Sequence, residues 1–354
     1  MFLKNFDYYL PKELVAQKPI KPRDHSRLLV LNREMKELVH DRFFNIGKYL
    51  KKGDIVVLND SKVIPARLIT DEGKEIFLLR SLADNDSKWL CLAKYKGLTL
   101  VRFKDSTLVG KITEEGGQKI IRFNLLGNKF WQEVEKIGEV PTPPYIKSHN
   151  KYSKVKKDFY QTIFAREKGS VAAPTAGFHF TQKLVKALMR RGVEFVFITL
   201  HVGLGTFAPI RAERVEDHRM HAEWFNLSKY TADILNKAKI EGRRIVAVGT
   251  TATRVLENCA ITPLSPASKK MRILPCYGET KIFITPGYKF KFVDALITNF
   301  HLPHSTPLLL ASAFIENRRG IKKNEGIKIL FKVYKEAIKK KYRFYSFGDA
   351  MLII

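Results

Sequence analysis

The pattern of apolar residues changes along this chain of 354 residues, and the change limits the folds that the chain can adopt. Between Asp60 and Lys147 the apolar residues come in short alternating runs, separated by Gly-Gly and Asn-Asp turn signals. The runs cover residues 75–79, 89–93, 98–103, 107–112 and 119–123. Alternation with a period of two is typical of strands with one buried face. This block therefore predicts a small antiparallel barrel or sandwich.

Helices and strands alternate in the rest of the sequence. We expect strands at residues 26–31, 54–58, 194–202, 243–248 and 342–347, and helices at residues 41–50, 181–191, 228–240, 250–258 and 327–340. Such alternation with short loops favours an α/β domain with a mixed sheet. We predict that residues 1–59 and 151–354 form this domain. The β-rich block 60–150 is predicted to be inserted into it, and the stiff connector 140–145 closes the insertion.

The chain is strongly basic, with 63 Lys and Arg residues, 35 Asp and Glu residues and a net charge of +28. This excess favours a polyanionic partner, because each phosphate contact releases condensed counterions. Solvated lysine-rich faces are an alternative explanation. The block 60–150 has 15 basic and 12 acidic residues, so most of the excess lies outside it. Candidate phosphate contacts form two clusters, Lys147, Lys151, Lys154, Lys156 and Lys157, and Arg318, Arg319, Lys322 and Lys323.

Cysteine usage and hydropathy indicate a cytoplasmic protein. Cys91, Cys259 and Cys276 are far apart and form no CxxC pair, so neither a disulfide framework nor a zinc finger is expected. Residues 1–7 lack the basic head and apolar run of a signal peptide. No apolar stretch approaches the roughly 18 residues that a membrane span needs. We therefore expect no membrane partner.

Histidines in the second half of the chain are the main functional signal. Six of the nine lie in loop-like segments, namely His179, His201, His218, His221, His301 and His304. α/β domains bind ligands at the carboxyl ends of their strands, so we expect these side chains to converge on one site. Imidazole is also well suited to proton transfer near neutral pH. A structural role remains open for His179, which can brace the turn before the helix N-cap Thr181.

The segment 200–223 combines small residues with polar ones. His201 is followed by Gly203, Gly205 and Thr206, which is typical of a pocket wall. The segment continues with a charged and polar set, Arg211, Asp217, His218, His221 and Glu223. Imidazoles oriented by carboxylates favour acid–base chemistry. The same side chains can hold a metal, but the chain has no HExxH motif, and we expect no metal.

Two further segments have the composition of ligand-binding loops. Residues 248–254 lead from a strand into a Thr-rich helix start, where free N–H groups, Thr250, Thr251 and Arg254 suit an anion. A plain N-cap at Thr250 is compatible with this interpretation. Thr298, Asn299 and His301 lie in a loop that is pinned by proline, and polar loops of this kind usually carry function.

Read together, these segments resemble the S-adenosylmethionine:tRNA ribosyltransferase-isomerases of queuosine biosynthesis. The resemblance also includes residues 6–8, 23–28, 53–54, 59–67, 278–280, 286–288, 342–344 and 347–350. It extends from the first ten residues to the last ten. The chain departs from the family pattern at Ser61, Leu204, Phe178 and His304, where Thr, Ala, Leu and Lys are usual. The last departure weakens a catalytic role for His304.

The resemblance implies an α/β domain with an inserted six-stranded barrel. It implies S-adenosylmethionine as co-substrate and, as the other substrate, the anticodon stem-loop of a tRNA with 7-aminomethyl-7-deazaguanine at the wobble position. The products are epoxyqueuosine-tRNA, adenine and methionine. We expect the protein to act as a monomer.

Residue roles follow as hypotheses. Proton transfer is assigned to His179, His201, His218 or His221, which Asp217 and Glu223 orient. Binding of S-adenosylmethionine is assigned to Gly203, Gly205, Thr206, Thr250, Thr251, Arg254, Thr298, Asn299 and His301. Binding of the tRNA is assigned to Asp60, Arg67, Arg211, Lys151, Lys154, Lys156 and Lys157.

Two other functions explain part of the sequence. A tRNA-binding module without chemistry accounts for the charge and the barrel, but it leaves the polar loops unused and predicts no saturable uptake of S-adenosylmethionine. A metal-dependent hydrolase would use His218 and His221, and a strong chelator would abolish its activity.

Replacing the five lysines between Lys147 and Lys157 with serine should flatten the salt dependence of RNA binding. Each lost phosphate contact lowers the number of counterions that binding releases, and this number sets the salt dependence. The measurement is the slope of the logarithm of the binding constant against the logarithm of salt concentration. An unchanged slope would remove these lysines from the interface.

Overall fold

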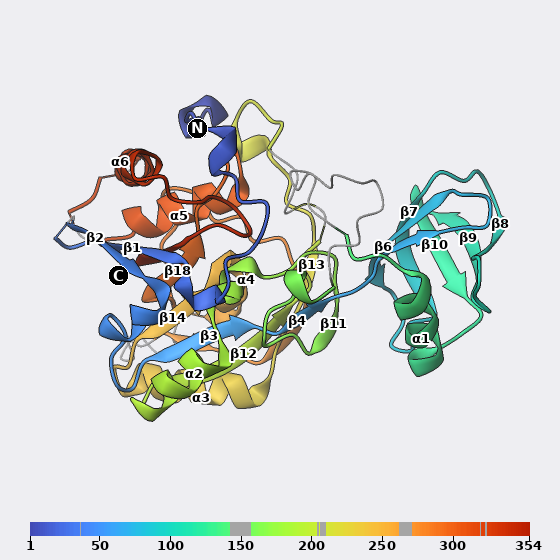
Figure 1. Ribbon diagram of the computed structural model, residues 1–354, viewed down its shortest axis with the longest axis horizontal. Coiled ribbons are helices and arrows are strands. Elements are labelled where there is room, and N and C mark those ends of the chain that lie inside the picture. The colour runs from blue at the N-terminus through green and yellow to red at the C-terminus, as the bar shows by residue number, and fades with distance from the viewer. Residues whose placement is uncertain are drawn as a thin grey trace.

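The computed structural model has two β-sheets of very different shape (Figure 1). It describes residues 1–35, 37–141, 157–203, 205, 210–261, 271–318, 320–322 and 324–354. The larger sheet has nine strands in the order β17 (Cys276–Thr280), β13 (Glu223–Leu227), β12 (Glu194–Leu200), β3 (Ile55–Asn59), β14 (Ile245–Val248), β18 (Ala295–Asn299), β19 (Ala350–Ile353), β1 (Arg27–Asn32) and β2 (Glu37–Arg42).

The nine-stranded sheet is mixed, as predicted. Its centre is parallel, because β3 pairs in parallel with β12 and β14, and β14 pairs in parallel with β18. The outer pairs β12–β13, β13–β17, β18–β19 and β1–β2 are antiparallel, whereas β1 and β19 are parallel. Every residue of β3 is buried, which is why its sequence is a continuous apolar run and does not alternate.

Helices cover both faces of this sheet. Ile55 and Val57 of β3 pack into the core on one face, together with α3 (Lys229–Ile240), α4 (Gly249–Cys259), α5 (Thr306–Glu316) and α6 (Glu325–Lys339). Val56 and Leu58 point to the other face, where they meet α2 (Gln182–Arg190) and the 3₁₀ helix Phe43–Lys48. Because alternate side chains of β3 point to opposite faces, the strand contributes to both cores.

The smaller sheet has six antiparallel strands in the order β5 (Arg67–Ile69), β6 (Glu75–Ser81), β7 (Lys88–Ala93), β10 (Gln118–Phe123), β9 (Val109–Glu115) and β8 (Thr99–Arg102). It has its own core, in which Trp89 packs on Phe130 and Trp131 of α1 (Gly127–Ile137). The sequence analysis missed α1. Figure 1 shows this sheet at one end of the molecule, away from the large sheet.

The expected six antiparallel strands are present, and they form a curled half-barrel. Its edge strands β5 and β8 do not pair as strands in the described part of the chain. The backbone N–H of Asp71, just after β5, donates to the carbonyl of Arg102 at the end of β8 (3.0 Å). β5 has only three residues, too few to extend this hydrogen bond into a strand pair.

Two short strands connect the sheets. β4 (Ser61–Val63) follows β3 directly and pairs in parallel with β11 (Glu167–Ser170). The chain therefore leaves the large sheet through β4 toward the half-barrel and comes back through β11 (Figure 1). The division into residues 1–59 with 151–354 and residues 60–150 stays a prediction.

Two predicted elements are wrong. Residues 41–50 are not one helix, because β2 continues to Arg42 and the 3₁₀ helix Phe43–Lys48 follows it. The carboxylate of Asp41 accepts hydrogen bonds from Asn45 Nδ2 (2.7 Å) and Tyr49 Oη (2.9 Å). Residues 342–347 are not a strand, since Tyr345 has a φ of +72° and the buried ring of Phe344 packs in the core. The last strand is β19. No helix among the described residues has both the length and the apolar character to cross a membrane.

Candidate active site

The carboxyl ends of the parallel strands β12, β3, β14 and β18 meet at one edge of the large sheet. α4 begins there directly after β14, with Gly249 at a φ of +85°, a backbone conformation that strains any larger residue. The first turn of α4 places Thr250 and Thr251 in the lining of two neighbouring hollows. The structure thus brings the loops after β12, β14 and β18 to one place, and it leaves the start of α4 between them.

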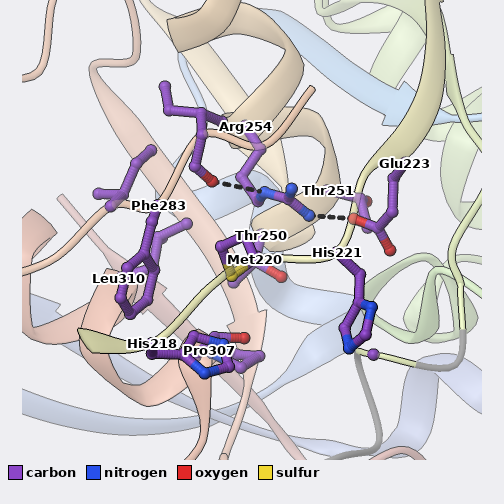
Figure 2. Close-up of a pocket in the computed structure, with 14 residues that line it drawn as sticks. His218, Met220, His221, Glu223, Thr250, Thr251, Arg254, Phe283, Pro307 and Leu310 are labelled. Atoms are coloured by element: carbon purple, nitrogen blue, oxygen red, sulfur yellow. Dashed lines mark hydrogen bonds and ion pairs between the residues drawn. The ribbon is translucent and has the colours of Figure 1, made fainter. Parts of the chain in front are cut away.

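The first hollow, of about 560 Å³, has a buried arginine in its lining (Figure 2). Arg254 Nη1 donates to Glu223 in an ion pair between two buried side chains, and Nε donates to the carbonyl of Ile282 (3.2 Å). The other carboxylate oxygen of Glu223 accepts from the N–H of Gly203 (2.9 Å). Arg254 Nη2 is buried and has no hydrogen-bond partner among the described residues. The guanidinium is therefore fixed in position with one donor to spare.

Two of the predicted histidines line the first hollow. His218 meets the ring of Phe283 edge-on (5.3 Å between centroids), and burial, with a smaller contribution from His221, lowers the pKa of His218. His221 is exposed at the rim. A Cβ on Gly205 would lie 2.5 Å from the His221 ring, so only glycine lets the two segments approach this closely. Met220, between the two histidines, also lines the hollow.

The second hollow, of about 640 Å³, has no residue with a formal charge among the described residues that line it. Its walls include Thr298, Asn299 and His301. His301 Nε2 lies 2.9 Å from Thr298 Oγ1, and burial lowers the pKa of His301 to about 3, so this imidazole is neutral. Asn299 Nδ2 donates to the carbonyl of Tyr345 (2.9 Å). Thr250, Thr251 and Pro307 line both hollows.

His179 is buried behind the second hollow. Its Nδ1 lies 2.8 Å from Ser26 Oγ. Burial, helped by the charge of Arg343, lowers its pKa to about 3, and the Asn299 amide works in the opposite direction. The ring lines a third, smaller hollow, which shares Ser346 with the second one. We therefore assign His179 a structural role in the wall of the site and not direct contact with a ligand.

His201 lies at the junction between the sheets, outside the lining of the first two hollows. Its Nδ1 lies 2.7 Å from Ser61 Oγ, and its ring stacks on Trp224 (5.0 Å, 18°). A Cβ on Gly169 would come within 2.6 Å of this ring. Burial lowers the pKa of His201 to about 4. The tight packing indicates a structural role at β4 and β11.

The remaining predicted residues are not gathered at the hollows. Asp60 is buried and accepts from Arg166 (2.8 Å) and Thr199 Oγ1 (2.8 Å). Arg67 pairs with Glu75 and Glu139 within the half-barrel and its return segment. Arg211 and Asp217 are exposed and line neither hollow. Thr206, Lys151, Lys154, Lys156 and the side chain of Lys157 lie outside the described residues.

Sequence reasoning missed several residues that line the hollows, and three of them matter for the chemistry. Met220 and Phe283 line the first one, and Tyr160 lines the second. Phe283 follows β17 in an apolar segment that reads as ordinary core, and Tyr160 is one of many aromatic residues. The position of Met220 between His218 and His221 was the only available signal. Within the described ranges no three His, Cys, Asp or Glu side chains gather as a metal site would require.

A mixed α/β sheet with two adjoining hollows at its strand ends, each with a few polar groups in its lining, has the architecture of an enzyme that binds a small substrate. The model of the queuosine biosynthesis protein family matches residues 3–353. The chain is 46% identical over 366 residues to the S-adenosylmethionine:tRNA ribosyltransferase-isomerase of Halothermothrix orenii, and over 364 residues to that of Carboxydothermus hydrogenoformans, with 100% of each chain covered in both comparisons.

A solved structure agrees with these relatives. The crystal structure of S-adenosylmethionine tRNA ribosyltransferase from Thermotoga maritima is 34% identical, has a TM-score of 0.53, and the match covers 99% of this chain and 100% of that one. This chain belongs to the S-adenosylmethionine:tRNA ribosyltransferase-isomerase family of queuosine biosynthesis. The family resemblance seen in the sequence is confirmed, and the chain is an enzyme of the transferase-isomerase type.

Replacing Glu223 with alanine should lower the free energy of unfolding by about 3–5 kcal/mol, because it leaves the buried Arg254 charge without its partner. The matched control is Asp217→Ala, which removes an exposed carboxylate from the same segment and should change stability by less than about 0.5 kcal/mol. Urea unfolding of the full chain measures both. Equal effects of the two substitutions would contradict the anchoring role of Glu223.

Proposed function

We propose that this enzyme transfers and isomerises the ribosyl part of S-adenosylmethionine onto 7-aminomethyl-7-deazaguanine at the tRNA wobble position, giving epoxyqueuosine-tRNA, adenine and methionine. The observation that carries this proposal is the spare Nη2 donor of Arg254 in the first hollow. A buried guanidinium with a free donor suits a carboxylate, and S-adenosylmethionine carries one on its methionine half. Family membership supports the reaction class.

The methionine half of S-adenosylmethionine fits the first hollow. Arg254 binds its carboxylate, and the hydroxyls of Thr250 and Thr251 at the start of α4 add donors at the positive end of the helix. The ring of Phe283 offers an aromatic face to the cationic sulfur. Gly203 and Gly205 hold the loop after β12 close to Glu223 and His221. Thr206 belongs to the same predicted loop.

The reaction needs a base and an acid close to the ribose. The base removes a 5′ hydrogen that the neighbouring sulfonium has acidified, the ribose opens and adenine leaves with a proton from the acid. The aminomethyl nitrogen then attacks, and the epoxide closes as methionine leaves. We assign these proton transfers to His218 and His221, because they line the first hollow. The lowered pKa of His218 keeps its imidazole neutral and able to accept a proton.

The tRNA anticodon stem-loop is assigned to the half-barrel and to the basic segment 147–157 that follows it in the sequence. The half-barrel, as a domain of residues 60–150, contributes to recognition of the modified base, and Lys151, Lys154, Lys156, Lys157 and Arg211 contact phosphates. Asp60 and Arg67, whose side chains are held by ion pairs, are assigned to the same substrate. We further propose that the enzyme acts as a cytoplasmic monomer without a metal.

The decisive experiment incubates the full chain with S-adenosylmethionine and tRNA that carries the precursor base. We expect adenine release together with a gain in mass on the RNA, and no loss of activity with a strong chelator. A protein that binds the tRNA but shows no saturable uptake of S-adenosylmethionine would be a binding module, and this result would overturn the proposal. Activity that a chelator abolishes would favour the metal-dependent alternative.

Replacing His218 or His221 with alanine should reduce adenine release by about 10²–10⁴-fold, the usual range for loss of a general acid or base. In the wild type, the rate should fall as the pH drops through the lowered pKa of His218, since the protonated imidazole cannot accept a proton. The control is His25→Ala, a substitution of an exposed histidine that packs on Phe44. If His218→Ala and His221→Ala both remain active, the acid–base assignment is wrong.

A further inference from the structure

The second hollow contains buried polar atoms that the protein itself does not satisfy. The hydroxyl of Tyr160 and Thr251 Oγ1 belong to residues that line it, and neither atom has a hydrogen-bond partner among the described residues. Tyr160 is 1% exposed. Native proteins pair most buried polar atoms, so two unpaired ones around one hollow indicate a ligand that pairs them.

The chemistry of the lining restricts that ligand. The described residues of the hollow offer hydroxyl and amide groups and the neutral imidazole of His301, but no formal charge. An ionic group would lose its hydration there without a counter-charge. Residues 172–176 also line the hollow; they are mainly small and apolar and can lie against a flat ring.

We propose that the second hollow is the subsite for a neutral purine-type base and that Tyr160 is a specificity-determining residue of it. This inference rests on the proposed function. The Tyr160 hydroxyl donates to or accepts from a ring nitrogen or exocyclic group of the base. Thr251 Oγ1 forms a second hydrogen bond with the base.

Two bases in the proposed reaction share this chemistry, the adenine of S-adenosylmethionine and the 7-deazaguanine of the tRNA. The shared wall favours adenine. Thr250, Thr251 and Pro307 line both hollows, so one molecule with a carboxylate at one end and a base at the other can reach Arg254 and Tyr160 at once.

The position of Tyr160 is set by packing. Its ring lies edge-on against Phe178 (5.9 Å) and Phe347 (6.0 Å), and these two rings stack on each other (5.8 Å, 16°). The hydroxyl lies beside Ala173 and Ser346 without hydrogen-bond geometry to either. Replacing Tyr160 with phenylalanine therefore removes one polar atom and retains the aromatic cluster.

The test measures inhibition of the full enzyme by its two small products, adenine and methionine, and by the free 7-aminomethyl-7-deazaguanine base. We expect Tyr160→Phe to raise the inhibition constant of adenine about tenfold, the effect of one lost hydrogen bond, and to leave that of methionine unchanged. Arg254→Lys should raise the inhibition constant of methionine and leave that of adenine unchanged. Lysine keeps a positive charge for Glu223 but lacks the second donor of the guanidinium. The control Tyr342→Phe removes a buried hydroxyl that contacts His40 (2.8 Å) and should change neither constant.

Each result has a distinct meaning. A tenfold change confined to the deazaguanine base supports the subsite and assigns it to the tRNA. An unchanged constant for both bases in Tyr160→Phe, in an enzyme whose wild type releases adenine, overturns the subsite and leaves the proposed function intact. A wild type that releases no adenine from S-adenosylmethionine with precursor tRNA overturns the proposed function itself.

Discussion

The ion pair between Glu223 and Arg254 is the interaction on which the site depends. It joins the first residue of β13 to the middle of α4, and both side chains are buried. Burying two charges is costly, and the attraction between them compensates only when the geometry and the remaining hydrogen bonds are good. Here the N–H of Gly203 and the carbonyl of Ile282 supply those bonds. The pair thus fixes the loop after β12, the start of β13 and the segment after β17 around one guanidinium.

This arrangement separates the charge in the site from its neutral part. Arg254 lies in the lining of the first hollow, and the start of α4 lies in the lining of both. The described residues that line the second hollow have no formal charge. A substrate with a charged amino-acid end and a neutral base end is matched by such a pair of hollows in one orientation only. Reversing it would leave a carboxylate without a counter-charge and a base against a guanidinium.

The sequence predicted the architecture better than the chemistry of individual histidines. Continuous apolar runs gave the central strands, and the Ser228 and Thr181 caps marked the starts of α3 and α2, because these signals are local. The burial of His179 and His201 depends on residues that are distant in the sequence. Ser26 and Ser61, which hold these rings, are 153 and 140 residues away along the chain. The sequence therefore indicated where imidazoles gather but not which ones are neutral and packed.

Two of the departures from the family pattern can be interpreted from the fold. Ser61 keeps the hydroxyl that contacts His201 and lacks only a methyl group, so the junction bond is retained. Phe178 is larger than the usual leucine, and its ring packs against both Tyr160 and Phe347. A wider aromatic cluster restricts the rotation of the Tyr160 ring, since a buried ring turns only if its neighbours move. The substitution therefore makes the wall of the second hollow more rigid, and it does so without adding a polar atom to it.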